Sequence, residues 1–253
     1  MSVHVIGDTA VLTGRSLRHI TRSVDTIITT AVTPIALMLL FVFVLGGAID
    51  TGGGSYIDYL LPGILLITVA SGIAYTAYRL FLDLQGGILE RFRSMPIARS
   101  AILWAHVLTS VVANLVSVAV VVAVALVLGF RSSAGVGGWL AVTGILAVFT
   151  LALTWVAIIA GLTAKTVDGA SAFSYPLIFL PFISSAFVPT ASMPGPVRWF
   201  AENQPVTSIV NSIRALLTRQ PVGADLWVAL AWCVGILVVA YAVSLAVYRR
   251  RFA

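Results

Sequence analysis

The sequence contains few residues that could carry out chemistry, and their spacing matches no catalytic motif. A Walker A loop needs Gly-Lys-Ser/Thr, because its lysine must reach the terminal phosphates of a nucleotide. The single lysine, Lys165, lies in "GLTAKTVDG" and has no glycine directly before it. The glycine-rich stretch "DTGGGS" from Asp50 to Ser55 is typical of a flexible turn. We therefore expect no catalytic residue and no ATP hydrolysis through a P-loop in this chain.

Potential metal ligands are scattered in the same way. The three histidines, His4, His19 and His106, lie far apart, and no HExxH motif joins any two of them. The single cysteine, Cys233, excludes an intramolecular disulfide and a CxxC metal site. Because Cys233 lies within an apolar run, we expect it to be a small buried hydrophobic residue. The sequence predicts no metal site and no cofactor bound by this chain.

Transport driven by protons or sodium usually requires ionisable side chains deep in the membrane. The apolar runs of this sequence are almost free of them. Arg79 and Asp83 lie one helical turn apart at the end of a run, where we expect a local ion pair or extension to the interface. We expect His106 and Asn114 to be polar groups that help helices to pack. The energy for any transport would then come from a partner protein.

The composition is that of a membrane protein, so these residues are positioned by membrane-spanning elements. The chain has 253 residues, of which 60% are hydrophobic and 9% charged, and its mean hydropathy is +1.06. A soluble domain contains about 25% charged residues, so a globule of this size could not bury so much apolar surface. The net charge is +6. Since the basic residues lie between apolar runs, where they set membrane topology, nucleic acid is not an expected partner.

The predicted fold is an all-α, multi-pass membrane protein with a single transmembrane domain over residues 1–253. Each of six runs is close to the 20 or so residues that cross a bilayer. The predicted spans cover residues 27–49, 59–81, 101–128, 139–162, 170–188 and 226–248. The fifth contains Pro176 and Pro181, so we expect it to be kinked and packed inward, where neighbours satisfy the freed carbonyls.

The distribution of basic residues predicts the orientation in the membrane. If the N-terminus is cytoplasmic, the inner connections hold eleven Arg or Lys residues and the outer connections hold four. The positive-inside rule therefore places both termini in the cytoplasm.

Residues 1–26 are polar and contain no cleavable signal peptide pattern. Their apolar residues recur at helical spacing, and Arg15, Arg18 and Arg22 fall on another face. This pattern predicts an interfacial helix on an anionic leaflet. A solvated tail that happens to be amphipathic is the alternative.

Two connections are predicted to contain short helices. Residues 86–98 place Ile88, Phe92 and Met95 at helical spacing, after two glycines and before Pro96, which predicts a short amphipathic helix. Residues 194–219 hold apolar stretches that lie between prolines and are too short to span a bilayer. They predict interfacial or re-entrant helices on the outer side.

Two segments carry a family resemblance. The segment "FLPFISSAFVPTASMPGPVRWFAENQPVTSIVNSIRALL", from Phe179 to Leu217, resembles the C-terminal signature of type-2 ATP-binding-cassette exporter permeases. The segment "GGILERFRSMPIARSAIL", from Gly86 to Leu103, is similar to the inner loop of that family between spans two and three. The order of amphipathic N-terminus, six spans and outer helices also agrees. Within the family the chain most resembles the daunorubicin-resistance type.

The resemblance implies a complex in the bacterial plasma membrane. Two permease subunits, identical or closely related, would pair with two copies of a separate ATPase subunit that binds ATP and Mg. The inner helix would dock on the ATPase, and the outer segment would cap the pathway. The coupling residues implied are Glu90, Arg91, Phe92, Arg93, Ser94, Met95 and Pro96. The outer gate residues implied are Pro194, Trp199, Phe200, Asn203, Pro205 and Arg214.

The expected function is export of a drug, lipid-like or secondary-metabolite substrate, with membrane lipids along the N-terminal helix. Export of a polysaccharide or teichoic acid by the same superfamily is one alternative. A non-transporting membrane scaffold or an integral-membrane enzyme is another. Glu90, Arg91 and Arg93 could also be charges that only set the topology. In the same way, Arg198, Glu202 and Arg214 could merely hold the outer helices at the headgroup level.

Overall fold

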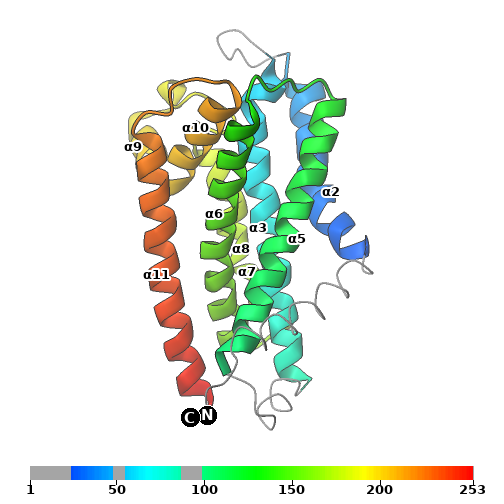
Figure 1. Ribbon diagram of the computed structural model, residues 1–253, viewed down its shortest axis with the longest axis vertical. Helices are drawn as coiled ribbons and strands as arrows, with labels where there is room; N and C mark the ends of the chain where they lie inside the picture. The colour runs from blue at the N-terminus through cyan, green and yellow to red at the C-terminus, as the bar shows by residue number, and fades with distance from the viewer. Residues whose placement is uncertain (1–23, 48–54, 87–98, 253) are drawn as a thin grey trace.

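The computed structural model describes residues 24–47, 55–86 and 99–252. In these ranges the regular elements are all helices, and no strand occurs among them. Figure 1 shows the long helices side by side along the vertical axis, with α9 and α10 gathered at one end. The C-terminal ends of α3 and α11 lie at the opposite end. The all-α prediction is confirmed for this part of the chain.

The helices follow one another with short connections. In chain order they are α2 (Val24–Leu40), a π-helical turn η1 (Phe41–Leu45), α3 (Tyr56–Gln85), α5 (Arg99–Val127), α6 (Val136–Thr163), α7 (Val167–Ala172), α8 (Ser174–Phe179), the 3-10 turns η2 (Leu180–Ile183) and η3 (Thr190–Ser192), α9 (Gly195–Asn203), α10 (Pro205–Leu217) and α11 (Asp225–Phe252).

Four of the six predicted spans are helices long and apolar enough to cross a membrane, namely α3, α5, α6 and α11. Their ends agree with the predicted ends to within four residues. The first and fifth predicted spans are shorter apolar helices, Thr30–Leu45 and Val167–Ile183. The prediction of six full spans is therefore confirmed for four segments. The two short helices between residues 194 and 219 are present as α9 and α10.

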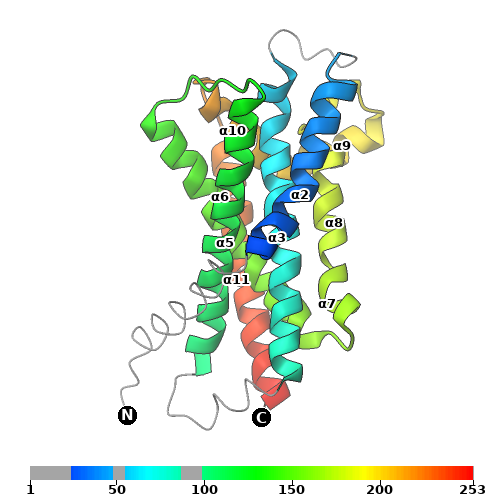
Figure 2. The same ribbon diagram turned by 90° about the vertical axis from the view of Figure 1, so that its right-hand side faces the viewer.

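The fifth segment is broken, as its prolines predict, into α7, α8 and η2. The expectation that it packs inward holds for one side of the segment, where Phe173, Leu177 and Ile178 lie against the core. The small side chains of Ala170 and Ser174 are buried in α7 and α8. The other side, with Tyr175 and Phe179 at 61% and 62% exposed, faces away from the bundle. Figure 2 shows α7 and α8 along the side of the bundle next to α3.

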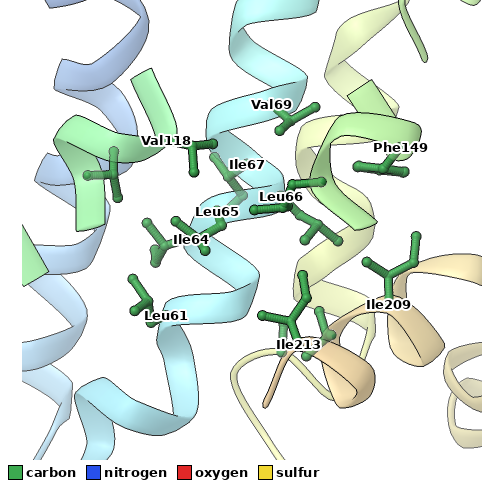
Figure 3. Close-up of a cluster of buried hydrophobic side chains, with 14 of the residues drawn as sticks. Leu61, Ile64, Leu65, Leu66, Ile67, Val69, Val118, Phe149, Ile209 and Ile213 are labelled. Atoms are coloured by element: carbon green, nitrogen blue, oxygen red, sulfur yellow. The ribbon is translucent and has the colours of Figure 1, made fainter. Parts of the chain in front are cut away.

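The apolar core is built around α3. Large aliphatic side chains of α3, among them Leu61, Ile64 and Leu65, are fully buried. They belong to one cluster with side chains from α5, α6 and α10, and Figure 3 labels ten of its members. Its members from other helices include Val118 of α5, Phe149 of α6, and Ile209 and Ile213 of α10. Because α3 is surrounded on most sides, it is the helix against which the others are placed.

Hydroxyl groups join the helices within this apolar core. The Ser110 hydroxyl of α5 lies 2.7 Å from the Thr76 hydroxyl of α3 and 3.3 Å from the Thr154 hydroxyl of α6. Further along α5, the Ser117 hydroxyl lies 3.1 Å from that of Thr30 in α2. Hydrogen bonds between side chains help helices to associate in a bilayer, where few other polar partners exist. These contacts fix the rotation of α5 against three neighbours.

Asn114 occupies a notch that only a glycine can provide. Its amide nitrogen donates to the Ser110 carbonyl at 3.0 Å. A Cβ atom added to Gly72 of α3 would lie 2.1 Å from the Asn114 side-chain oxygen. The expectation that Asn114 is a packing group agrees with this placement, since it is 2% exposed and lies against α3.

The Gly72 notch generates a stability prediction. Gly72→Ala should lower the thermal unfolding midpoint in detergent, because the new methyl group displaces a buried amide, a form of overpacking that costs about 1–3 kcal/mol. Gly144→Ala on α6 is the matched control, since no atom lies within 4 Å of a Cβ built there. Equal midpoints for the two variants would show that Asn114 moves aside without cost.

Candidate functional site

A stripe of polar side chains runs along one face of α10. Gln204 precedes the helix, and Thr207, Asn211 and Arg214 follow at intervals of three or four residues. Residues at these intervals share one face of an α-helix. On other faces of α10, Ile209 and Ile213 are buried in the core. The helix is therefore amphipathic, yet three members of its polar stripe point at protein backbone.

The stripe meets the irregular segment that follows α8. The Gln204 amide nitrogen donates to the carbonyls of Ile183 and Leu180. The Thr207 hydroxyl donates to the Ala201 carbonyl and accepts from the Ser185 N–H at 3.4 Å. The chain has left its α-helix at this point, so the segment has no continuous ladder of helical hydrogen bonds and several of its backbone groups need other partners. The side chains of α10 supply those partners.

Arg214 makes the most contacts in the stripe. Its Nη2 atom donates to the carbonyls of Tyr59 at 3.0 Å and Ser185 at 2.8 Å, and its Nη1 atom donates to the Asn211 side chain at 3.3 Å. The guanidinium carbon lies 3.8 Å from the centre of the Tyr59 ring, a cation–π distance. Among the described residues, no carboxylate lies within 4 Å of Arg214. The positive charge of Arg214 is therefore stabilised by backbone carbonyls and by the Tyr59 ring.

Residues 184–187 fit against the start of α3 with little space between them. A Cβ atom on Gly63 would lie 2.6 Å from the Ala186 methyl group, so only glycine allows this approach. The Tyr56 hydroxyl donates to the Phe187 carbonyl at 3.4 Å. The Phe187 ring stacks on Phe41 of η1, with centroids 4.7 Å apart. We call residues 180–217, from η2 through α10, the cap.

The predicted gate residues have different places within the cap. Arg214 alone joins the polar network. Trp199 and Phe200 are 69% and 45% exposed on α9, and the Asn203 side chain donates to the Trp199 carbonyl at 2.8 Å. Pro194 precedes α9 and Pro205 begins α10, as expected for a residue whose missing N–H is harmless in a first turn.

Charges on α9 neutralise one another. Arg198 Nε lies 2.8 Å from Glu202 Oε1, which also accepts from the Thr190 hydroxyl at 3.2 Å. These hydrogen bonds, that from Arg198 first, hold the pKa of Glu202 below its usual range. An aromatic pair beside a neutralised charge pair suits a helix lying at a membrane interface.

A second set of polar side chains lies at the opposite end of the bundle. His106 Nε2 of α5 lies 3.4 Å from Asp83 Oδ2 of α3. The sequence predicted either a local pair between Asp83 and Arg79 or extension of these side chains to the interface. Both residues lie in the described part of the chain, where they form no such pair, and the Arg79 guanidinium lies 5.9 Å from the Tyr75 ring centre. Asp83 therefore joins two helices instead of stabilising one.

Two predicted groups lie outside the described residues. They are the coupling residues Glu90, Arg91, Phe92, Arg93, Ser94, Met95 and Pro96 and the interfacial arginines Arg15, Arg18 and Arg22. Their roles stay predictions. Within the described ranges, no group of three or more potential metal ligands occurs.

Sequence reasoning missed most of the α10 stripe. The intervals between Gln204, Thr207, Asn211 and Arg214 were visible in the sequence and could have marked a polar face. Most of the backbone groups that these side chains contact were not visible, because they lie more than 20 residues away along the chain. His106 was assigned a packing role without a partner, since nothing in the sequence aligns it with Asp83.

Comparisons with known proteins give a consistent result. The family model for the ABC-2 type transporter matches residues 8–218. The chain is 28% identical over 225 residues to the daunorubicin resistance ABC transporter permease protein DrrB1 of Streptomyces coeruleorubidus, covering 86% of this chain and 77% of the relative. It is 30% identical over 254 residues to the probable doxorubicin resistance ABC transporter permease protein DrrC of Mycobacterium tuberculosis, covering 97% and 89%.

The contacts of Arg214 predict how its variants behave. Arg214→Ala should lower the thermal unfolding midpoint, because buried carbonyls lose their donor, at about 1–3 kcal/mol. The unfolding midpoint of Arg214→Lys should lie between those of Arg214→Ala and the wild type, since an ammonium group keeps the charge but not the planar arrangement of donors. Arg198→Ala on exposed α9 is the control and should melt like the wild type. A midpoint for Arg214→Ala equal to that of the control would contradict the assigned role.

Proposed function

Because this chain belongs to the ABC-2 type transporter family, we propose that it is the membrane-spanning permease subunit of an exporter in the bacterial plasma membrane. The family match over residues 8–218 is the observation that carries the proposal. The substrate is a drug, a lipid-like molecule or a secondary metabolite. The names of the relatives, which refer to resistance to daunorubicin and doxorubicin, support this class.

The permease works without catalysis of its own. Two copies of an ATPase subunit bind ATP and Mg and hydrolyse the nucleotide, and a second copy or close paralogue of the permease completes the complex. The scarcity of charged residues in the spans supports an external energy source: α6 and residues 103–127 of α5 contain no Asp, Glu, Lys or Arg. An ion gradient has little to act upon in such helices.

The inner face makes the contact with the ATPase. Arg91, Phe92 and Arg93 supply cationic and aromatic side chains, the residue types that dominate binding energy at protein interfaces. Arg15, Arg18 and Arg22 attract the anionic inner leaflet. In this orientation the cap closes the outer end of the pathway, and both termini are cytoplasmic.

Reconstitution with the ATPase tests the proposal. The full chain and a soluble P-loop ATPase expressed with it should purify together and enter lipid vesicles as one complex. Daunorubicin or another amphipathic compound should then stimulate ATP hydrolysis and accumulate in inside-out vesicles. A complex that forms but responds to no compound in such a screen would count against a drug or lipid exporter. Failure of any ATPase to co-purify would overturn the permease assignment.

The coupling hypothesis predicts a specific loss. The double substitution Arg91→Glu and Arg93→Glu should abolish substrate-stimulated ATP hydrolysis, because reversed charges repel the surface that the arginines bind. Arg249→Glu with Arg250→Glu, the same charge change on exposed residues of α11, is the matched control and should retain stimulation. Both variants must insert at wild-type levels, measured in purified membranes. Full stimulation in the Arg91 and Arg93 variant would remove these residues from the interface.

The proposed orientation can be measured by cysteine labelling. In a Cys233→Ser background, Ala224→Cys should react with a membrane-impermeant maleimide in intact cells, and Lys165→Cys should react only after the cells are opened. Both positions are exposed. Ala224 directly precedes α11, which begins at the end of the bundle that holds α9 and α10, and Lys165 lies in the connection after α6, which ends toward the opposite end (Figure 1). The reverse pattern would place the termini outside.

A further inference from the structure

The C-terminal end of α3 contacts α5 through an aspartate and a histidine. His106 Nε2 of α5 lies 3.4 Å from Asp83 Oδ2, and these side chains are 23% and 27% exposed. Among the side chains that the structure describes, Arg198 and Glu202 form an ion pair within α9. Asp83 and His106 are the one acidic and basic pair within 4 Å of each other that joins two different helices in this part of the chain.

Two further contacts join α3 and α5 closer to the middle of the membrane. Thr76 lies 2.7 Å from Ser110, hydroxyl to hydroxyl, and Gly72 receives the Asn114 side chain. The positions on α3 fall as those on α5 rise, as expected for two antiparallel helices in a fixed register. Polar contacts thus join α3 and α5 at three levels of one half of the bundle.

In its other half, α3 stays packed on α5 and also contacts the cap. Arg214 of the cap donates to the Tyr59 carbonyl and lies over the Tyr59 ring. Ala186, also in the cap, lies against Gly63 of α3. The helix between these two sets of contacts is continuous over 30 residues, a length of about 45 Å. Close-packed interiors transmit displacement rather than absorb it. A shift of the Asp83 end must therefore reach the cap or break a set of contacts.

We propose that α3 transmits the movement driven by the ATPase to the cap, and that Asp83 and His106 are positioning residues that make α3 and α5 move together. The inference rests on the proposed function, in which the ATPase contacts the connection between these two helices. Without the pair, the ATPase could displace one helix and leave the other behind. Hydrolysis would then continue, but less of it would drive transport.

The test uses the full chain reconstituted with its ATPase and compares transport with hydrolysis. Asp83→Asn and His106→Asn should each lower the ratio of daunorubicin transported to ATP hydrolysed by about fivefold, within the range of substitutions along a coupling network. Basal hydrolysis should stay near the wild-type rate. Asp168→Asn, an exposed acidic residue of α7, is the control and should leave the ratio unchanged.

Exchange of the two residues separates positioning from general packing. The double variant Asp83→His with His106→Asp restores opposite partners at the same site and should recover the ratio to within about twofold of wild type. A ratio that stays as low as in the single variants would overturn the role of the pair. Unchanged ratios in both single variants would do the same.

A second combination tests the link to the cap. Arg214→Lys and Asp83→Asn together should lower the ratio no further than the more severe single variant, because both interrupt the same helix. If the ratio in the double variant falls by the product of the two single-variant reductions, transmission through α3 would be overturned. A wild-type complex that shows no substrate-stimulated hydrolysis would instead overturn the proposed function, so the two failures are distinguishable.

Discussion

Backbone hydrogen bonding is the constraint on which the rest of this structure depends. A bilayer offers no water to backbone groups, so irregular chain is tolerated there only where other protein groups satisfy it. The chain leaves its helix after Phe179 and does not resume a long helix until α11. The polar stripe of α10 supplies hydrogen-bond donors to this irregular chain, since Gln204 and Arg214 donate to carbonyls of residues 180–186. One face of α10 thus serves the backbone while another packs on α3.

The same constraint explains why a cation is stable between helices with no carboxylate beside it. Hydrogen bonds from a charged donor contribute about 1.5–3 kcal/mol each, and Arg214 makes several at once to carbonyls. A planar guanidinium can also lie on the Tyr59 ring while its edge donates. Because these partners belong to α3 and to the segment after α8, satisfying the charge joins the cap to α3. The same hydrogen bonds of Arg214 therefore satisfy its buried charge and attach the cap to α3.

Sequence patterns predicted the elements whose stability is local, and failed where distant groups decide. Long apolar runs identify α3, α5, α6 and α11, because length and hydropathy alone allow a span. The segment with Pro176 was predicted to kink and to pack inward, and one side of it does lie against the core. The sequence did not show that Tyr175 and Phe179 on its other side are exposed, since no periodic pattern separates the two sides of such short helices. Asp83 had a candidate partner one turn away in Arg79. The register of α3 against α5 brought His106 closer, and no local pattern encodes that register.

Charge placement limits how energy can move through this molecule. Residues 103–127 of α5 and all of α6 have no Asp, Glu, Lys or Arg, so these stretches hold no acidic side chain, lysine or arginine at their centres. The described polar contacts between helices carry charge only near the ends, at Asp83 and at Arg214. Between those ends lie fully buried aliphatic side chains such as Ile64 and Leu65. Movement that begins at one end must therefore pass through packing, and α3 is the helix whose packing extends over the whole distance.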